Sequence, residues 1–207
     1  MTAAAFWDWF YANRFKYLFL NDENMTEKDA ALDELQQQLD AYHKGVYFLI
    51  GGNKDNDQEI VFTADGDVDQ FAAIEALVAE APSMENWRAI AFKQPLNYDF
   101  EVEMHGIRMS PSRLCFMPLA HADDPTNLGL RIGIPGYEET RDKAFFAIAF
   151  LIIDNLLGER AAAKNIRYME CVPYPEAGEE DGFFELMSLP DFIRWKEEMD
   201  AAGNPEQ

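Results

Sequence analysis

The side chains best suited to metal binding in this sequence are His121, Asp123 and Asp124. Imidazole and carboxylate groups both coordinate metal ions, and these three come from one short stretch. The stretch continues into Pro125, and Asp-Asp-Pro is ordinary turn composition. The spacings that hold zinc, His-x-x-x-His and Cys-x-x-Cys, do not occur in the sequence. We therefore interpret 121–125 as a solvated turn, keep metal binding as the alternative, and expect no metal and no cofactor.

A pair of carboxylates is the second candidate for chemistry. Glu101 and Glu103 alternate with Val102, and a strand would point both to one face about 7 Å apart. Two such acids can perform acid–base chemistry once a pocket shifts their pKa values. Trp87 and Tyr98 are the aromatic residues that would line this pocket, so Trp87, Tyr98, Glu101 and Glu103 are the candidate ligand-binding or partner-binding residues. Because acids are abundant in this chain, we favour a solvated face for the pair.

Nucleophiles and phosphate loops are poorly supported by the sequence. Ser110 and Ser112 flank a proline without a glycine elbow, and the apolar neighbours of Cys115 would raise the pKa of its thiol. Residues 51–54 read Gly-Gly-Asn-Lys and lack the Gly-Lys-Ser/Thr ending of a phosphate loop. We assign no catalytic residue, and the sequence leans away from an enzyme.

The element on which the predicted fold depends is a helix over 138–158. Every side chain in 144–153 is apolar, which favours a helix that is buried on most of its circumference. Glu138 and Glu139 stand where the helix dipole favours negative charge, and Gly158 is a typical C-cap. The apolar run is shorter than the roughly 18 residues of a membrane-spanning helix. Asp154 interrupts the apolar run. If it is buried, it must pair with a base such as Arg131, Arg160 or Arg167. We favour the alternative, in which the helix reaches the surface there and Asp154 is solvated.

The remaining elements follow from hydrophobic periodicity and turn residues. Helices are predicted over 6–20, 26–45, 68–81 and 189–202, and strands over 46–50, 59–64, 87–92, 100–104, 114–117, 128–134 and 165–172. We expect Trp7, Phe10 and Phe15 in the core, and Phe192, Trp195 and Met199 on one face of the last helix. The fold class is therefore α+β, a mainly antiparallel sheet of about six strands covered by helices, in one domain over 1–207.

Charge and cysteine content limit the function classes. The chain has 38 acidic and 17 basic residues, a formal net charge of −21, which repels nucleic acid and anionic membranes. A basic protein is the favoured partner, with 27–40 and 176–181 as candidate contact regions; the oligomeric state is left open. The two cysteines, Cys115 and Cys171, lie in strand-like contexts and fit buried side chains in a reducing compartment. The first residues lack a basic segment of the secretory type, so we expect a cytoplasmic location.

Several short motifs resemble those of a family of soluble bacterial proteins to which no activity is assigned. They are Trp-x-Trp-Phe at 7–10, Thr-Ala-Asp-Gly at 63–66, Ala-Pro at 81–82 with Trp87 and Ala-Phe at 91–92, and Leu-Leu-Gly-Glu at 156–159. The resemblance implies a bacterial cytoplasmic origin and gives no residue a role. We interpret the chain as a non-catalytic protein that acts through protein contacts, in the manner of an inhibitor or immunity protein. The alternative is an enzyme or ligand-binding protein with an aromatic-lined, acid-bearing pocket.

Overall fold

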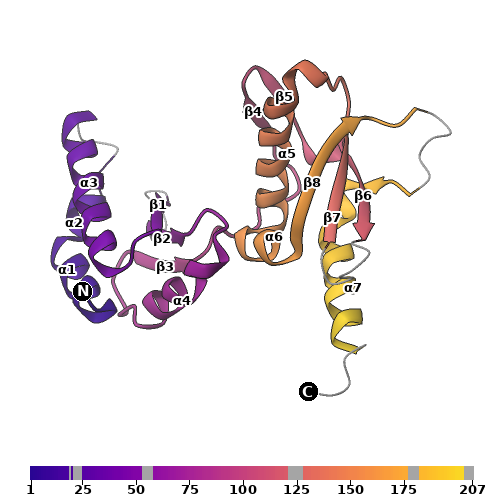
Figure 1. Ribbon diagram of the computed structural model, residues 1–207. Coiled ribbons are helices and arrows are strands. Elements are labelled where there is room, and N and C mark those ends of the chain that lie inside the picture. Colours follow the sequence, from indigo (N-terminus) through magenta and orange to yellow (C-terminus); the bar gives the residue numbers. More distant parts are fainter. Residues whose placement is uncertain (19, 21–24, 53–57, 121–127, 177–181, 203–207) are drawn as a thin grey trace. The chain divides into compact units, whose positions relative to one another are not determined.

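The computed structural model describes residues 1–18, 20, 25–52, 58–120, 128–176 and 182–202. These residues form a mixed α+β structure in two compact units, Met1–Lys93 and Gln94–Gln207 (Figure 1). We refer to them as unit 1 and unit 2 and describe each by itself. The expected single domain over 1–207 stays a prediction, because cooperative folding is a property separate from compactness.

Unit 1 is a small three-stranded sheet covered by helices. Its elements are α1 (Ala3–Asn13), α2 (Phe15–Leu18), α3 (Met25–Tyr42), β1 (Tyr47–Gly51), β2 (Gln58–Thr63), α4 (Phe71–Ala79) and β3 (Trp87–Ala91). β1 pairs with β2 antiparallel, and β2 pairs with β3 parallel. The predicted order of strand, strand, helix and strand in this part of the chain is confirmed.

The core of unit 1 is largely aromatic. Phe6, Trp7 and Phe10 of α1 are buried, and the rings of Phe6 and Trp7 meet Phe62 of β2 edge-on. The indole Nε1 of Trp7 donates a hydrogen bond of 2.7 Å to a backbone carbonyl of α4. The core assignments of Trp7 and Phe10 are confirmed, but that of Phe15 is wrong. α1 ends at Asn13, and the exposed Phe15 ring stacks on the guanidinium of its neighbour instead.

Unit 2 is a four-stranded sheet, a separate hairpin and three helices. Its elements are β4 (Val102–Met104), β5 (Ile107–Met109), β6 (Cys115–Ala120), β7 (Leu128–Ile134), α5 (Asp142–Leu157), α6 (Glu159–Asn165), β8 (Ile166–Pro173), β9 (Phe184–Glu185) and α7 (Leu189–Ala202). The strand order is β8-β7-β6-β9, in which β7 and β8 are parallel and the other pairs antiparallel. Among the described strands, β4 and β5 pair with each other and with no other strand.

The expected single sheet of about six antiparallel strands is wrong. The described residues form separate sheets of three, two and four strands, and two of the strand pairs are parallel. In both parallel pairs a helical connection lies between the strands, α4 before β3 and α5 with α6 before β8. A helical crossover returns the chain to the same end of the sheet, which makes the two strands parallel.

The organising helix is shorter and more one-sided than predicted. α5 runs from Asp142 to Leu157, and the three residues Glu139–Arg141 before it form a 3-10 turn. Phe145, Ile148 and Ile152 are buried in one hydrophobic core, which also contains the alternate apolar residues of β7. Phe146 and Phe150 are 40% and 50% exposed, so the helix is not buried all round. The sheet covers one side of a helix, and apolar composition alone does not cover the other.

The second face of β7 is built from glycines. Gly129 and Gly133 alternate with the buried apolar residues of this strand and therefore point to the opposite face. A methyl group on Gly133 would overlap the Sγ atom of Cys115 and lie 3.1 Å from Cδ of Pro175. Gly133 thus leaves room for two side chains that pack over the strand.

We expect Gly133→Ala to lower the free energy of unfolding by about 1–3 kcal/mol, the usual cost of overfilling a packed site. Cys115→Ala removes the main overlap, so the same substitution should cost less in that background, as a coupling energy in a double-mutant cycle. Gly51→Ala is the matched control, because an added methyl group there meets nothing within 4 Å. Chemical denaturation of the four variants measures this, and equal costs for Gly133→Ala and Gly51→Ala would contradict it.

Candidate functional site

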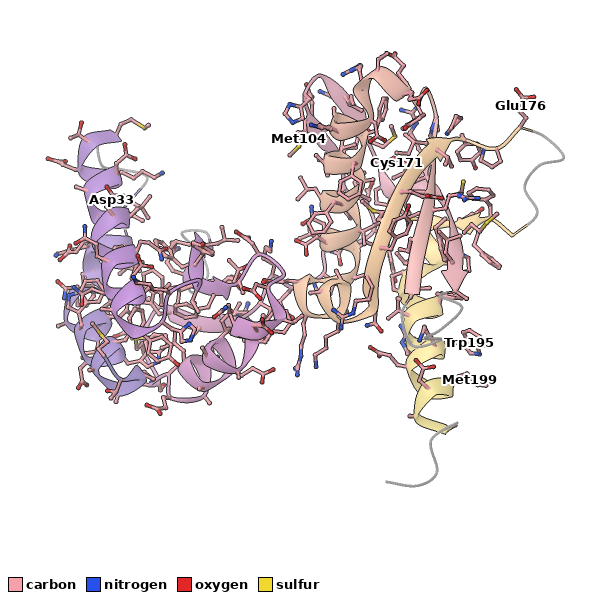
Figure 2. The ribbon with its side chains drawn as sticks, viewed as in Figure 1. Asp33, Met104, Cys171, Glu176, Trp195 and Met199 are labelled. Carbon is pink, nitrogen blue, oxygen red and sulfur yellow. The ribbon has the colours of Figure 1, made fainter. Side chains whose placement is uncertain are left out.

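The acidic helix α3 supplies a row of carboxylates at the surface of unit 1. Leu35 and Leu39 are fully buried and fix one side of this helix. Asp29, Asp33 and Asp40 are all exposed, and at about 100° per residue they fall within an arc of about 40°. We call these three residues the α3 acidic row; Asp33 is labelled in Figure 2.

Local contacts hold the row in place and leave its charge uncompensated. The side-chain amide of Gln36 donates to Asp40 Oδ1 at 2.8 Å and to the carbonyl oxygen of Val46 at 3.0 Å, which ties the end of α3 to the start of β1. Lys16 Nζ lies 3.0 Å from Glu34 Oε2, a pair outside the row. Within the described part of the chain, no carboxylate of the row forms an ion pair. The row is therefore a fixed surface of negative charge.

Two predicted regions fall wholly or partly outside the described residues. His121, Asp123 and Asp124 all do, so their interpretation as a solvated turn stays a prediction. In the second contact region, Glu176 is exposed and 177–181 are outside the described residues. Among the residues that the structure does describe, no three His, Cys, Asp or Glu side chains gather as a metal site.

The four candidate binding residues do not form one described site. Trp87 belongs to unit 1, where it is buried with its ring 5.2 Å from that of Phe10 and edge-on to it. Its Nε1 donor has no hydrogen-bond partner among the described residues. Tyr98, Glu101 and Glu103 belong to unit 2. The predicted pocket, lined by Trp87 together with Tyr98 and the two acids, is not described in either unit.

The two glutamates lie beside a base at the solvent-exposed hairpin of β4 and β5. Glu103 faces Arg108 in the strand register, and Arg108 Nε donates to Glu103 Oε2 at 3.0 Å. The pKa of Arg108 is raised, mainly by this hydrogen bond and to a smaller extent by the negative charges of Glu103 and Glu101. Both carboxylates act on one guanidinium, and all three side chains are exposed. This arrangement suits a solvated charge cluster better than acid–base chemistry, which needs an enclosed pair.

Tyr98 lines an open cleft of about 420 Å³ in unit 2. The buried side chains of Leu156, Leu157 and Ile193 form the apolar part of its lining, and Arg194 and Glu197 of α7 add charged groups. The other lining residues are Pro95, Leu96, Asn97, Ala161 and Pro190. The backbone N–H of Leu96 donates to the carbonyl oxygen of Asn155 at 2.7 Å and fastens the wall of the cleft to the end of α5. The volume suits a small molecule.

The preferred interpretation of Asp154 is wrong, because this residue is only 5% exposed. The helix does not reach the surface there. Gly158 has a φ of 77°, which turns the chain directly into α6, and Glu159 at the start of α6 is fully buried as well. Burial of Asp154 is the alternative that the sequence disfavours, because Asn155 beside it suggests that the last turn emerges from the core, and burial of Glu159 is not predicted. Both side chains make interactions within the structure.

A polar network that sequence analysis missed lies on the outer face of the unit 2 sheet. Arg131 of β7 pairs with Glu170 of β8, its register partner, and the hydroxyl of Tyr168 donates to Glu170 Oε2 at 2.7 Å. The pKa of Glu170 is lowered, first by the hydrogen bond from Tyr168 and second by that from Arg131. The signal was present in the sequence only as isolated charges on two strands whose pairing was not known.

Neither thiol is a nucleophile at neutral pH. Cys115 and Cys171 are both buried, as predicted, and neither forms a disulfide in this structure. Burial raises the pKa of Cys115, although hydrogen bonding with the backbone of Gly133 opposes the shift. Burial, with a smaller contribution from Asp142, raises the pKa of Cys171 to about 12. The thiolate is the reactive form, so both groups are inert in the folded protein.

Comparison with known proteins gives no match to this chain. No protein-family model matches the chain, and no curated protein or solved structure is significantly similar to it. The resemblance to a bacterial family therefore stays a prediction. Each helix in the described part of the chain is too short or too polar to cross a lipid bilayer.

We expect both cysteines to react with Ellman's reagent at neutral pH only after the protein is unfolded. Their raised pKa values keep them protonated, and burial excludes the reagent. A folded Ser112→Cys variant is the positive control, because residue 112 is exposed. Thiol titration with and without guanidinium measures this, and rapid reaction of the native protein would contradict it.

Proposed function

We propose that this protein acts without catalysis, by binding a basic protein partner through its acidic surface, as inhibitor and immunity proteins do. The observation that carries the proposal is the α3 acidic row: Asp29, Asp33 and Asp40 exposed in one line on a helix anchored from below. The formal charge of −21 means that the chain as a whole also favours a basic partner. The proposal includes a bacterial cytoplasmic setting and no binding of nucleic acid, which the net charge would repel.

The spacing of the row suits recognition of a basic surface. With a rise of 1.5 Å per residue, Asp29 and Asp33 stand about 6 Å apart along the helix, and Asp33 and Asp40 about 10 Å. Lysine and arginine side chains on a partner helix or strand can meet carboxylates at such intervals. Complementary charge of this kind speeds association and selects partners, more than it adds affinity.

A second candidate is a protein that binds a small ligand, and the cleft at Tyr98 favours it. The half-exposed Tyr98 ring lines the cleft together with apolar side chains, and Arg194, which also pairs with Asp191, would supply a positive charge for an anionic group. This candidate uses one of the four predicted binding residues. Glu101, Glu103 and Trp87 do not line the cleft.

To test the main proposal, the row is neutralised by Asp29→Asn, Asp33→Asn and Asp40→Asn. Proteins captured by the wild-type chain from a bacterial lysate should bind about tenfold more weakly to this variant, because three charge pairs are lost. Capture by the wild type should also decline as salt rises, since salt screens exposed charges.

The matched control for the row removes the same charge elsewhere in unit 1, with Asp8→Asn, Glu80→Gln and Glu85→Gln, all exposed positions. This control variant should capture the same lysate proteins as strongly as the wild type does. Binding that is unaffected by salt, or equally reduced in both variants, would contradict a role for the row.

The second candidate is tested by thermal denaturation with small aromatic compounds such as indole and benzoate. A ligand of the cleft should raise the Tm of the wild type increasingly with ligand concentration, and it should fail to raise that of Tyr98→Ala. Tyr174→Ala is the control, because Tyr174 is similarly exposed and does not line the cleft. Equal shifts in wild type and Tyr98→Ala would contradict ligand binding there.

A further inference from the structure

The last helix carries large apolar side chains that are exposed among the described residues of unit 2. Leu189 and Ile193 of α7 are buried in the core, whereas Trp195 and Met199 are 55% and 54% exposed. Figure 1 shows α7 continuing past the end of the strands, so its second half has no sheet to pack against. Trp195 and Met199, one helical turn apart, lie on the same side of α7 in Figure 2.

This exposed side is continuous with a buried aromatic anchor. The Trp195 ring lies 5.6 Å from Phe192, and Phe192 lies 5.6 Å from the fully buried Phe116. Phe116 also contacts the exposed Phe184 of β9 at 5.7 Å. We call Phe184, Phe192, Trp195 and Met199 the α7 apolar surface. Tryptophan, held by packing at its base and exposed at its edge, is the residue type that most often dominates binding energy.

Carboxylates border the α7 apolar surface. Asp191 and Glu198 are seven residues apart and so share one side of α7, next to Trp195. Asp191 shares an exposed ion pair with Arg194, whereas Glu198 makes none with the described residues. The other border is the pair of Lys196 and Asp200. The helix carries four carboxylates and two bases, so its surroundings favour cations.

We propose that the α7 apolar surface docks a cationic amphipathic helix of a partner protein. Apolar residues at intervals of three and four on the partner would pack on Trp195 and Met199, and its flanking lysine or arginine side chains would meet Asp191 and Glu198. Charge selects this occupant: a second copy of the chain carries −21 and is repelled, as is an anionic lipid surface. The inference rests on the proposed function and names the class of partner and a second contact surface.

The probe is a synthetic helical peptide of leucine and lysine, about 14 residues long and so about four turns. Its scrambled isomer has the same charge without the apolar face, and a leucine–glutamate analogue has the face with the opposite charge. Fluorescence anisotropy of labelled peptide gives the affinity. Trp195 is the most exposed of the four tryptophans, so its emission should shift to the blue when the peptide covers it.

We expect the full chain to bind the amphipathic peptide at least about tenfold more tightly than either control peptide. Trp195→Ser with Met199→Ser should weaken binding by about tenfold or more, and Glu198→Lys should weaken it while leaving the apolar side chains in place. The matched control is Phe146→Ser with Phe150→Ser, an exposed apolar pair of the same spacing on α5, which should bind as the wild type does. Circular dichroism checks that each variant is folded.

Equal binding of the scrambled peptide, or unchanged binding by the Trp195 and Met199 variant, would overturn the inference. Loss of binding in the α5 control with no loss in the α7 variant would overturn it too. The variant of the α3 acidic row separates the two proposals. If that variant loses lysate partners while the peptide fails to bind α7, the proposed function stands and this inference falls. If the peptide binds α7 while the variant of the α3 acidic row captures lysate proteins as the wild type does, this inference stands and the role proposed for the row falls.

Discussion

The packing of α5 against β7 is the constraint on which unit 2 depends. Leu130, Ile132 and Ile134 of β7 are fully buried, and they share one hydrophobic core with the apolar side of α5. Because strand residues alternate between faces, this choice commits Gly129, Arg131 and Gly133 to the opposite side. The glycines there admit neighbouring side chains, and Arg131 meets its carboxylate partner. One hydrophobic contact thus determines both faces of the sheet.

The distribution of charge follows from how few bases the chain has. Arg108 and Arg131 are each engaged by a carboxylate of a neighbouring strand, and Lys16 by Glu34. With 38 acids against 17 bases, most carboxylates must face water without a counter-charge. Such a surface keeps copies of the chain apart and draws cations toward it. The α3 acidic row and the border of the α7 apolar surface are where rigid helices fix that charge in space.

Two pairs of exposed apolar residues in unit 2 have a common origin. Phe146 and Phe150 are exposed on α5, and Trp195 and Met199 are exposed on the part of α7 that continues past the strands (Figure 2). In each case the helix is held by its other side, so the exposed residues contribute little to that packing. Large apolar side chains retained where folding does not use them are typical of contact surfaces.

The sequence by itself determined the local elements, because hydrophobic period and turn chemistry act within a few residues. The strand predicted over 128–134 and the helix predicted over 189–202 occupy those residues in the structure, and both cysteines are buried as expected. The candidate site was predictable only as single residues, such as Tyr98 beside a cleft. Only the tertiary structure decided that two strand pairs are parallel, that Trp87 and Tyr98 belong to different units, that Asp154 is buried and that Trp195 is exposed. Each of these depends on contacts between residues far apart in the chain, which no local pattern encodes.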